Sequence, residues 1–106
     1  MSSKEKVISL LGLAMRSGNV VSGDFIVEKT IKKRQVKLLL LSEEVAKNNA
    51  EKYEHLSERY GLTMRQILTK EELGNAIGKE ARVVVGVVDA GFAKKLVELI
   101  DTDKIE

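Results

Sequence analysis

Val83-Val84-Val85-Gly86-Val87-Val88 is the most strongly β-forming stretch of the chain. Since β-branched side chains favour extended backbone, residues 83–88 are predicted to form a strand. A second apolar stretch, Leu38-Leu39-Leu40-Leu41, ends at Ser42, and its shortness and polar flanks predict a buried strand. Apolar residues at consecutive positions indicate that both faces of each strand are buried. The two stretches therefore predict a sheet that carries helices on both sides.

Apolar residues at helical spacing predict five helices around these strands, and two further short segments are predicted as the outer strands. Capping boxes at Ser2/Glu5 and Thr69/Glu72 and a capping Asp89 mark three of the helix starts. The alternation predicts the α/β class, as a three-layer α–β–α sandwich with a four-stranded mixed sheet. The predicted helices cover residues 2–18, 24–34, 44–60, 69–78 and 89 onward, and the outer strands cover 19–21 and 62–68.

The composition excludes several classes of site. The chain has 106 residues, of which 43% are hydrophobic, and we expect one domain spanning residues 1–106. The absence of cysteine excludes disulfides and thiolate chemistry, and a single histidine excludes a multi-histidine metal site. No stretch reaches the roughly 18 apolar residues that span a bilayer. The polar N-terminus lacks the apolar core of a signal peptide, so we expect the cytoplasm.

The net charge of +2 is unevenly distributed. Residues 1–41 carry eight basic and three acidic side chains, a local charge of +5, whereas residues 42–62 carry −2 and the remainder −1. A basic first third is a modest electrostatic footprint for a polyanion. On charge alone, lysine-rich helices that serve only solubility are the better interpretation.

No motif of a common catalytic or nucleotide-binding site occurs in the sequence: there is no glycine-rich phosphate-binding loop and no nucleophile elbow. His55 lies on the polar side of its predicted helix between Glu51 and Glu58, which indicates a solvated histidine rather than a general base. The pairs Glu43-Glu44 and Glu71-Glu72 stand at predicted helix starts, where complementing the helix dipole accounts for them. We therefore expect no catalytic activity, no cofactor and no metal.

The second predicted helix carries the clearest binding signal. Ser22-Gly23-Asp24 has the composition of a loop that becomes its N-cap. Backbone N–H groups at such a terminus, and lysines one or two turns later, can both contact phosphates. A helical projection predicts an outward face that holds an aromatic ring and three lysines, although the ring could equally pack beneath the preceding loop. The outward residues are Phe25, Lys29, Lys32 and Lys33, and the buried residues are Val27, Thr30 and Ile31.

Two long segments of the sequence resemble one known family. Residues 22–44, and residues 69–84 with Leu73-Gly74-Asn75-Ala76-Ile77-Gly78-Lys79-Glu80 as their most specific part, resemble the L-seven-Ae/L-thirty-e family of ribosomal and kink-turn RNA-binding proteins. The segments 10–18 and 89–93 are similar to its small bacterial YlxQ-type branch. The resemblance covers nearly the whole chain. It implies an α–β–α sandwich that binds structured RNA.

The resemblance also implies a site, formed by the start of the second helix and the loop before the last strand. Gly23 matches the glycine of the family's Gly-x-Asn-Glu motif, and Lys29 matches its basic residue one turn later. Phe25 and Ile26 stand where the family has the Asn-Glu pair, and their side chains cannot make the same polar contacts to base edges. Arg82 replaces an apolar or proline position. The implied RNA-binding residues are Ser22, Gly23, Asp24, Phe25, Lys29, Lys32, Lys33, Glu80, Ala81 and Arg82.

Three functions fit these observations. The first is a non-catalytic RNA-binding protein of the ribosomal type, whose partner is a structured RNA such as a kink-turn or ribosomal RNA and which associates with the ribosome. A structured RNA is favoured because only 4% of residues are aromatic, too few for extended stacking on a single strand. The second is a protein–protein adaptor that uses an exposed Phe25/Ile26 patch. The third is an RNA-recognition domain related to those attached to RNA-modifying enzymes.

Overall fold

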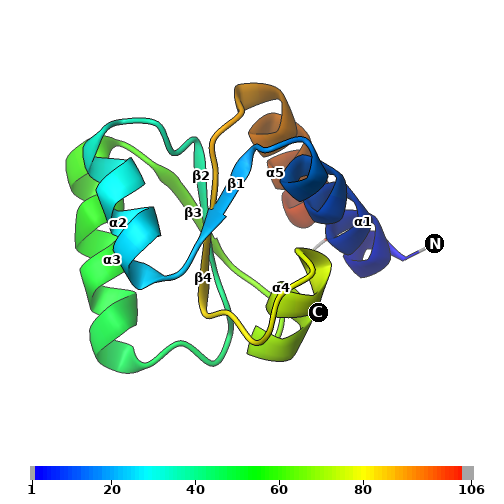
Figure 1. Cartoon of the computed structure of the whole chain (residues 1–106), viewed down its shortest axis with the longest axis horizontal. Coiled ribbons are helices and arrows are strands. Elements are labelled where there is room, and N and C mark those ends of the chain that lie inside the picture. Colours follow the sequence, from blue (N-terminus) through cyan, green and yellow to red (C-terminus); the bar gives the residue numbers. More distant parts are fainter. Residues whose placement is uncertain (1, 104–106) are drawn as a thin grey trace.

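In the computed structural model, which describes residues 2–103, helices and strands alternate along the chain (Figure 1). The two apolar stretches form the strands predicted for them. Their ends differ from the prediction by no more than one residue. The elements are α1 (Ser3–Arg16), β1 (Val20–Ser22), α2 (Asp24–Lys32), β2 (Leu38–Leu41), α3 (Lys47–Tyr60), β3 (Thr63–Gln66), α4 (Lys70–Ala76), β4 (Val84–Val87) and α5 (Ala90–Asp103).

The four strands form one mixed sheet in the order β1-β4-β2-β3. β2 runs parallel to β3 and antiparallel to β4, and β1 pairs antiparallel with β4. The two apolar strands therefore occupy the centre, where every residue of both is buried. This arrangement confirms the predicted four-stranded mixed sheet.

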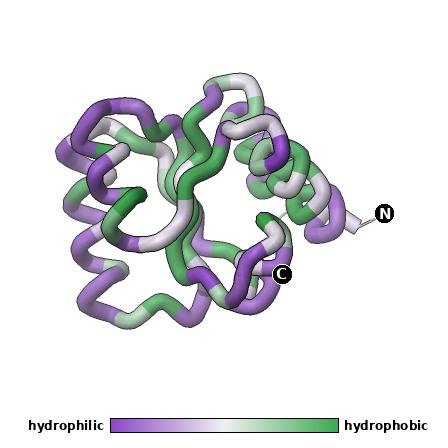
Figure 2. The backbone as a smooth tube through the Cα atoms, viewed as in Figure 1, coloured by the Kyte–Doolittle hydropathy of each residue, from purple (hydrophilic) through white to green (hydrophobic). Residues whose placement is uncertain are grey.

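Helices cover both faces of the sheet, as predicted: α2 and α3 lie on one side and α1, α4 and α5 on the other (Figure 1). Successive β2 side chains point to opposite faces, so Leu38 and Leu40 join the core beneath α1, α4 and α5. Leu39 and Leu41 join the core beneath α2 and α3. Figure 2 shows the hydrophobic strands between helices with hydrophilic outer faces. The three-layer α–β–α sandwich is thereby confirmed.

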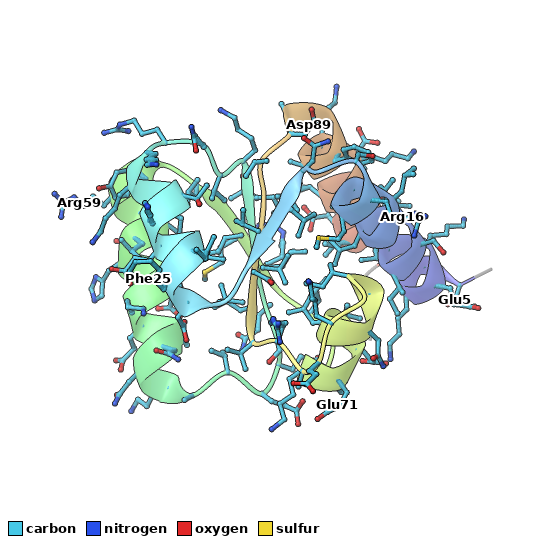
Figure 3. The ribbon with its side chains drawn as sticks, in the orientation of Figure 1. Glu5, Arg16, Phe25, Arg59, Glu71 and Asp89 are labelled. Carbon is cyan, nitrogen blue, oxygen red and sulfur yellow. The ribbon has the colours of Figure 1, made fainter. Side chains whose placement is uncertain are left out.

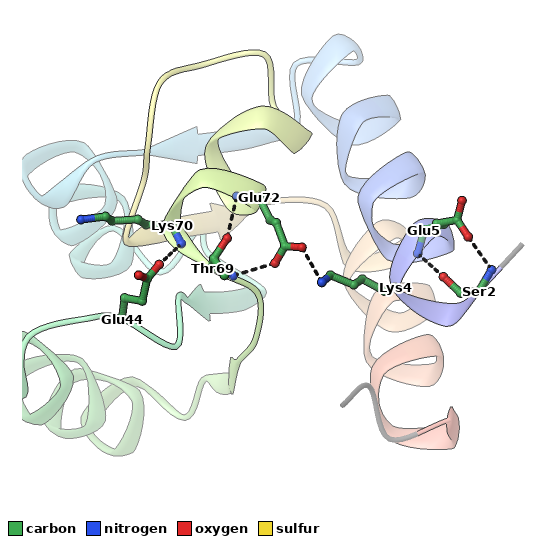
Figure 4. Close-up of polar contacts among 7 residues, drawn as sticks. All are labelled: Ser2, Lys4, Glu5, Glu44, Thr69, Lys70 and Glu72. Carbon is green, nitrogen blue, oxygen red and sulfur yellow. Dashed lines mark hydrogen bonds and ion pairs between the residues drawn. The ribbon is translucent and has the colours of Figure 1, made fainter.

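The predicted helix caps are present. Ser2 and Glu5 form a reciprocal capping box at α1, and Thr69 and Glu72 form another at α4 (Figure 4). At α5, the Asp89 carboxylate accepts a hydrogen bond of 2.8 Å from the backbone N–H of Phe92. These local signals set where the helices begin.

The start of the third helix was predicted wrongly. α3 begins at Lys47, because the backbone after β2 first turns on Ser42, whose Oγ accepts from the Glu44 N–H at 3.1 Å. Glu43 and Glu44 therefore precede α3 and do not complement its dipole. Glu44 instead accepts a 2.7 Å hydrogen bond from the backbone N–H of Lys70, at the start of α4 (Figure 4). A carboxylate at a helix N-terminus is favourable there.

The second helix is also shorter than predicted: α2 ends at Lys32, two residues before Arg34. Arg34 adopts a positive φ of 60°, and the N–H of Gln35 reaches back to the Thr30 carbonyl at 3.2 Å. This 6→1 hydrogen bond is the helix-ending pattern in which a left-handed residue follows the last turn. The left-handed turn leads the chain from α2 toward β2.

Candidate nucleic-acid interface

The start of α2 and the loop before β4 meet at one corner of the sheet. Ser22 pairs with Val85 across the β1–β4 ladder, and the Gly23 N–H donates to the Val84 carbonyl at 3.3 Å. Gly23 is the N-cap of α2, with a φ of 91° that glycine adopts without strain and no side chain to cap the helix. The first N–H groups of α2 consequently have no side-chain cap. We name this place, residues 22–23 and 78–82, the corner.

The loop of the corner packs directly on α4. A Cβ on Gly74 would collide with the Glu80 carbonyl oxygen and lie 2.6 Å from the Glu80 carbonyl carbon. The Lys79 N–H donates to the Gly74 carbonyl at 2.9 Å, and Gly78 turns the chain with a φ of 71°. The spacing of the two glycines in the family-like motif is thereby explained. With no side chain on Gly74, the backbone of residues 79–81 lies directly against α4. Glu80 and Ala81 are exposed.

Arg82 is bound to its own loop. Its guanidinium donates to the carbonyl oxygens of Glu80 and Ala81 at 3.2 and 3.1 Å, and its Nε lies 3.4 Å from Ser22 Oγ. Its backbone N–H donates to the Lys70 carbonyl at 3.0 Å. Arg82 thus connects the two segments of the corner through Nε and Nη1. Its predicted contact with RNA stays a prediction.

Asp24 differs from its prediction as part of an N-cap. It is the first residue of α2, and its carboxylate turns to α3, where it accepts a 2.6 Å hydrogen bond from the Tyr53 hydroxyl and lies 3.9 Å from Lys52 Nζ. Burial, together with this hydrogen bond, raises the pKa of Tyr53. Asp24 therefore holds α2 against α3, and its contact with RNA stays a prediction.

The outer face of α2 is exposed as predicted. Phe25 is 77% exposed and Ile26 46%, whereas Val27 and Ile31 are fully buried. Packing of Phe25 beneath the preceding loop is therefore wrong, and its ring projects from the helix (Figure 3). An open surface hollow of about 410 Å³ lies along this face. It is lined by Phe25, Glu28, Lys29, Lys32 and Lys33.

The charges along this face are not equivalent. Lys32 forms an ion pair of 3.1 Å with Glu28, which also pairs with Lys52 at 3.2 Å. Hydrogen bonds from Lys32 and then from Lys52 lower the pKa of Glu28. Among residues 2–103, neither Lys29 nor Lys33 has an acidic partner within 4.0 Å. The predicted group of three lysines therefore presents two unpaired charges.

The sequence interpretation missed basic residues at both ends of this surface. The Arg34 and Arg59 guanidinium groups lie 5.1 and 5.7 Å from the centre of the Tyr60 ring, beyond the end of α2. No local signal in the sequence indicates this stacking. Lys79 is exposed in the loop of the corner. Its position directly after Gly78, in the loop predicted to contact RNA, could have indicated Lys79 as a basic residue of the site.

Across residues 2–103 the structure gathers no group of three or more His, Asp or Glu side chains that could hold a metal ion. His55 is exposed on α3, on the polar side where it was predicted. No helix within this range has the length and apolar character needed to cross a membrane.

Comparison with known proteins gives consistent matches. The model of the ribosomal protein L7Ae/L30e/S12e/Gadd45 family matches residues 5–97. The RNA-binding protein YlxQ of Bacillus subtilis (strain 168) is 46% identical over 92 residues, which span 87% of this chain and 92% of that protein. The RNA-binding protein YlxQ of Enterococcus faecium is 32% identical over 99 residues, 93% and 95% of the two chains. A solved structure of a protein with unknown function from Bacillus halodurans C superposes with a TM-score of 0.88 at 40% identity, covering 91% of this chain and 97% of that one.

Proposed function

Because the chain belongs to the ribosomal protein L7Ae/L30e/S12e/Gadd45 family, we propose that it is a non-catalytic RNA-binding protein whose ligand is a structured RNA. Its two similar proteins from Bacillus subtilis and Enterococcus faecium carry the name RNA-binding protein. We place the RNA on the corner and on the outer face of α2, within the cytoplasm. A kink-turn or a ribosomal RNA is the ligand we expect.

The observation that carries this proposal is a pair of unpaired lysines, Lys29 on α2 and Lys33 at its C-cap. Lys29 and Lys33 are exposed, lie one turn apart and follow a helix N-terminus without a side-chain cap. Phosphate groups are attracted both to lysines and to the N–H groups of such a terminus. Since phosphate contacts supply most of the affinity of nucleic-acid binding, this arrangement suits an RNA backbone.

The corner supports recognition by shape. Its loop is fixed by Gly74 and by the hydrogen bonds of Arg82, so its backbone can dock as a preformed surface. Phe25 and Ile26 have no polar groups for base edges, so sequence-specific contacts to bases are not expected from them. We therefore expect tighter binding to a sharply kinked RNA hairpin than to a straight hairpin of equal length.

The test is a charge reversal with a matched control. The Lys29→Glu/Lys33→Glu variant is compared with Lys6→Glu/Lys94→Glu, an equal change of charge at exposed positions on α1 and α5. With a kink-turn hairpin as probe, we expect the first variant to lose more than about tenfold in affinity and the second to lose little. The slope of log affinity against log salt should be roughly −2 to −5 for the wild type, and shallower by about 2 in the first variant. Affinity independent of salt, or equal losses in both variants, would exclude the proposed surface.

The alternative is a protein–protein adaptor, which the exposure of Phe25 and Ile26 favours. It predicts a protein partner that co-purifies after nuclease treatment and is lost in Phe25→Ala. Crosslinking in cells, followed by sequencing of the attached RNA, separates the two functions. Abundant crosslinked RNA without a nuclease-resistant protein partner would support the RNA-binding function.

A further inference from the structure

Phe25 is the most exposed large hydrophobic side chain of the described residues. Its exposed fraction is 77%, against 47% for Leu13 on α1 and 46% for Ile26. A single exposed apolar residue needs no explanation in a soluble protein. Phe25, however, forms one wall of the open hollow along α2, whose remaining wall consists of lysine and glutamate side chains. The ring is thus presented inside a charged surface rather than an apolar one.

The charges around the ring are asymmetric. On one flank, Asp24 is bound to Tyr53, and Glu28 is bound to Lys32 and Lys52. On the other flank, Lys29 follows one turn after Phe25 and Lys33 one turn later, about 6 Å apart along the helix axis. Neither of these two lysines has an acidic partner in the described chain. A ligand that covers the ring from this flank meets two unneutralised positive charges.

We propose that Phe25 is a stacking platform for one unpaired nucleobase of the bound RNA, while Lys29 and Lys33 contact phosphates of the same strand. This inference rests on the RNA-binding function proposed above. Nucleobases are planar, and every base has a π-face that can stack on an aromatic ring. The base must be unpaired and unstacked, because neighbouring bases cover both faces of a base within a helix.

The charge pattern favours a nucleotide over an apolar protein anchor. Lysines are depleted in the cores of protein–protein interfaces, where their charge would have to leave water. A nucleotide, by contrast, joins an apolar base to an anionic phosphate. The base matches the Phe25 ring, and the phosphate matches the two neighbouring lysines. Stacking uses the face of the base and not its edge. We therefore expect recognition of an unpaired position with little dependence on which base occupies it.

The test uses two RNA hairpins that differ at one position. One carries a single unpaired 2-aminopurine in its stem, and the other has the same stem fully paired. The wild type is compared with Phe25→Leu, which keeps an apolar side chain but removes the aromatic face, and with Phe25→Tyr, which keeps the ring. Leu13→Ala is the control for loss of an exposed apolar side chain on another helix.

We expect Phe25→Leu to weaken binding of the hairpin with the unpaired base by at least about fivefold, the lower end of the range for replacing a stacking aromatic residue by alanine, because leucine keeps part of the apolar contact. Phe25→Tyr and Leu13→Ala should bind like the wild type. The fluorescence of 2-aminopurine should change on binding the wild type, because the base leaves its neighbours in the stem for the Phe25 ring, and this change should be smaller on binding Phe25→Leu. Thermal unfolding should be unchanged in Phe25→Leu, since the side chain is exposed.

Different results would exclude stacking on Phe25 and the proposed RNA-binding function. If the wild type and Phe25→Leu bind both hairpins with equal affinity, RNA binding stands and stacking on Phe25 is excluded. If the wild type binds neither hairpin nor a kink-turn RNA, both are excluded. A nuclease-resistant protein partner lost in Phe25→Leu, together with RNA binding that this substitution leaves unchanged, would assign the ring to a protein interface.

Discussion

The corner and the outer face of α2 are adjacent in the chain, yet they use their polar groups in opposite ways. In the corner, Arg82 binds carbonyl oxygens of its own loop, and the loop backbone lies directly on Gly74. On the outer face, Lys29 and Lys33 have no acidic partner in the described residues, and Phe25 is largely in water. The Arg82 side chain of the corner is used in contacts within the protein, whereas Lys29 and Lys33 on the outer face are free to bind a ligand.

The corner therefore maintains the shape of the surface, and the outer face of α2 supplies the charges that give affinity for a polyanion. A surface whose polar groups are internally paired keeps its conformation but has few groups left for a ligand. A surface of unpaired cations gains from binding a polyanion, yet contributes little to folding. Substitutions in the corner should therefore change the free energy of unfolding, whereas substitutions on the outer face should change only binding.

Gly74→Ala should have the largest effect. The added methyl group meets the backbone of Glu80, which cannot move without displacing the loop. We expect a loss of about 3 kcal/mol in the free energy of unfolding, measured by urea denaturation. Asn75→Ala, at the neighbouring exposed position of α4, should change this free energy by less than about 0.5 kcal/mol. Equal values for the two variants would show that the loop does not depend on the glycine.

Arg82→Ala and Lys33→Ala compare the two regions directly. Loss of the guanidinium leaves carbonyl oxygens of the loop without their donors, so Arg82→Ala should lower the free energy of unfolding by about 1 kcal/mol. Lys33→Ala should leave unfolding unchanged and weaken RNA binding. Denaturation and binding to the kink-turn hairpin are measured for both variants. If both lower stability alike, or neither does, the division between the regions is wrong.

Tyr53→Phe tests the contact that holds α2 against α3. It removes the hydroxyl that donates to Asp24 at 2.6 Å and leaves a carboxylate partly buried with one partner fewer. We expect a loss of about 1 kcal/mol on thermal or chemical unfolding. Tyr60→Phe is the matched control, because the structure shows only ring contacts for Tyr60, with Arg34 and Arg59. An equal loss in the control would mean that the hydroxyl bond to Asp24 is not what stabilises this pair of helices.

The smallest expected effect is on acid stability. The ion pair with Lys4, followed by the hydrogen bond from the Thr69 N–H, lowers the pKa of Glu72 in the folded protein (Figure 4). A lowered folded pKa gives stability that is present above the unfolded value of about 4.3 and is lost as the pH falls through the folded value. Glu72→Gln should therefore be less stable than the wild type near neutral pH. It should also lose less stability than the wild type between about pH 5 and pH 3, the window that spans the unfolded value and extends below it.

Glu71→Gln, at the exposed neighbouring position, provides the comparison for this pH effect. Its unfolding free energy should follow the wild-type pH dependence throughout that acidic window. A Glu72→Gln profile identical to that of Glu71→Gln would show that the ion pair with Lys4 does not contribute to folding.

The parts of the molecule that follow local rules could be predicted from the sequence. Valine and leucine runs indicated the central strands, and capping boxes marked the starts of α1 and α4. The helical projection placed Phe25 and the lysines outward, because a 3.6-residue period fixes which side chains share a face. The orientation of this face thus depended on no contact distant in the sequence.

The roles that could not be predicted depend on partners far along the chain. Glu44 contacts a backbone group 26 residues away, Asp24 a hydroxyl 29 residues away and Arg82 a hydroxyl 60 residues away. No local pattern indicates such partners, since only the folded topology brings them together. Glu44 had been assigned to the dipole of α3, and the structure places its carboxylate at α4. For Asp24 and Arg82 the structure adds contacts within the protein, and their predicted contact with RNA stays a prediction.

Backbone amide chemical shifts, recorded while the kink-turn hairpin is titrated into the labelled protein, test the placement of the RNA most directly. The largest shifts are predicted at residues 22–33 and 78–82, with little change along α1 and α5. Shifts concentrated on α1 and α5, with residues 22–33 unperturbed, would contradict the proposed surface.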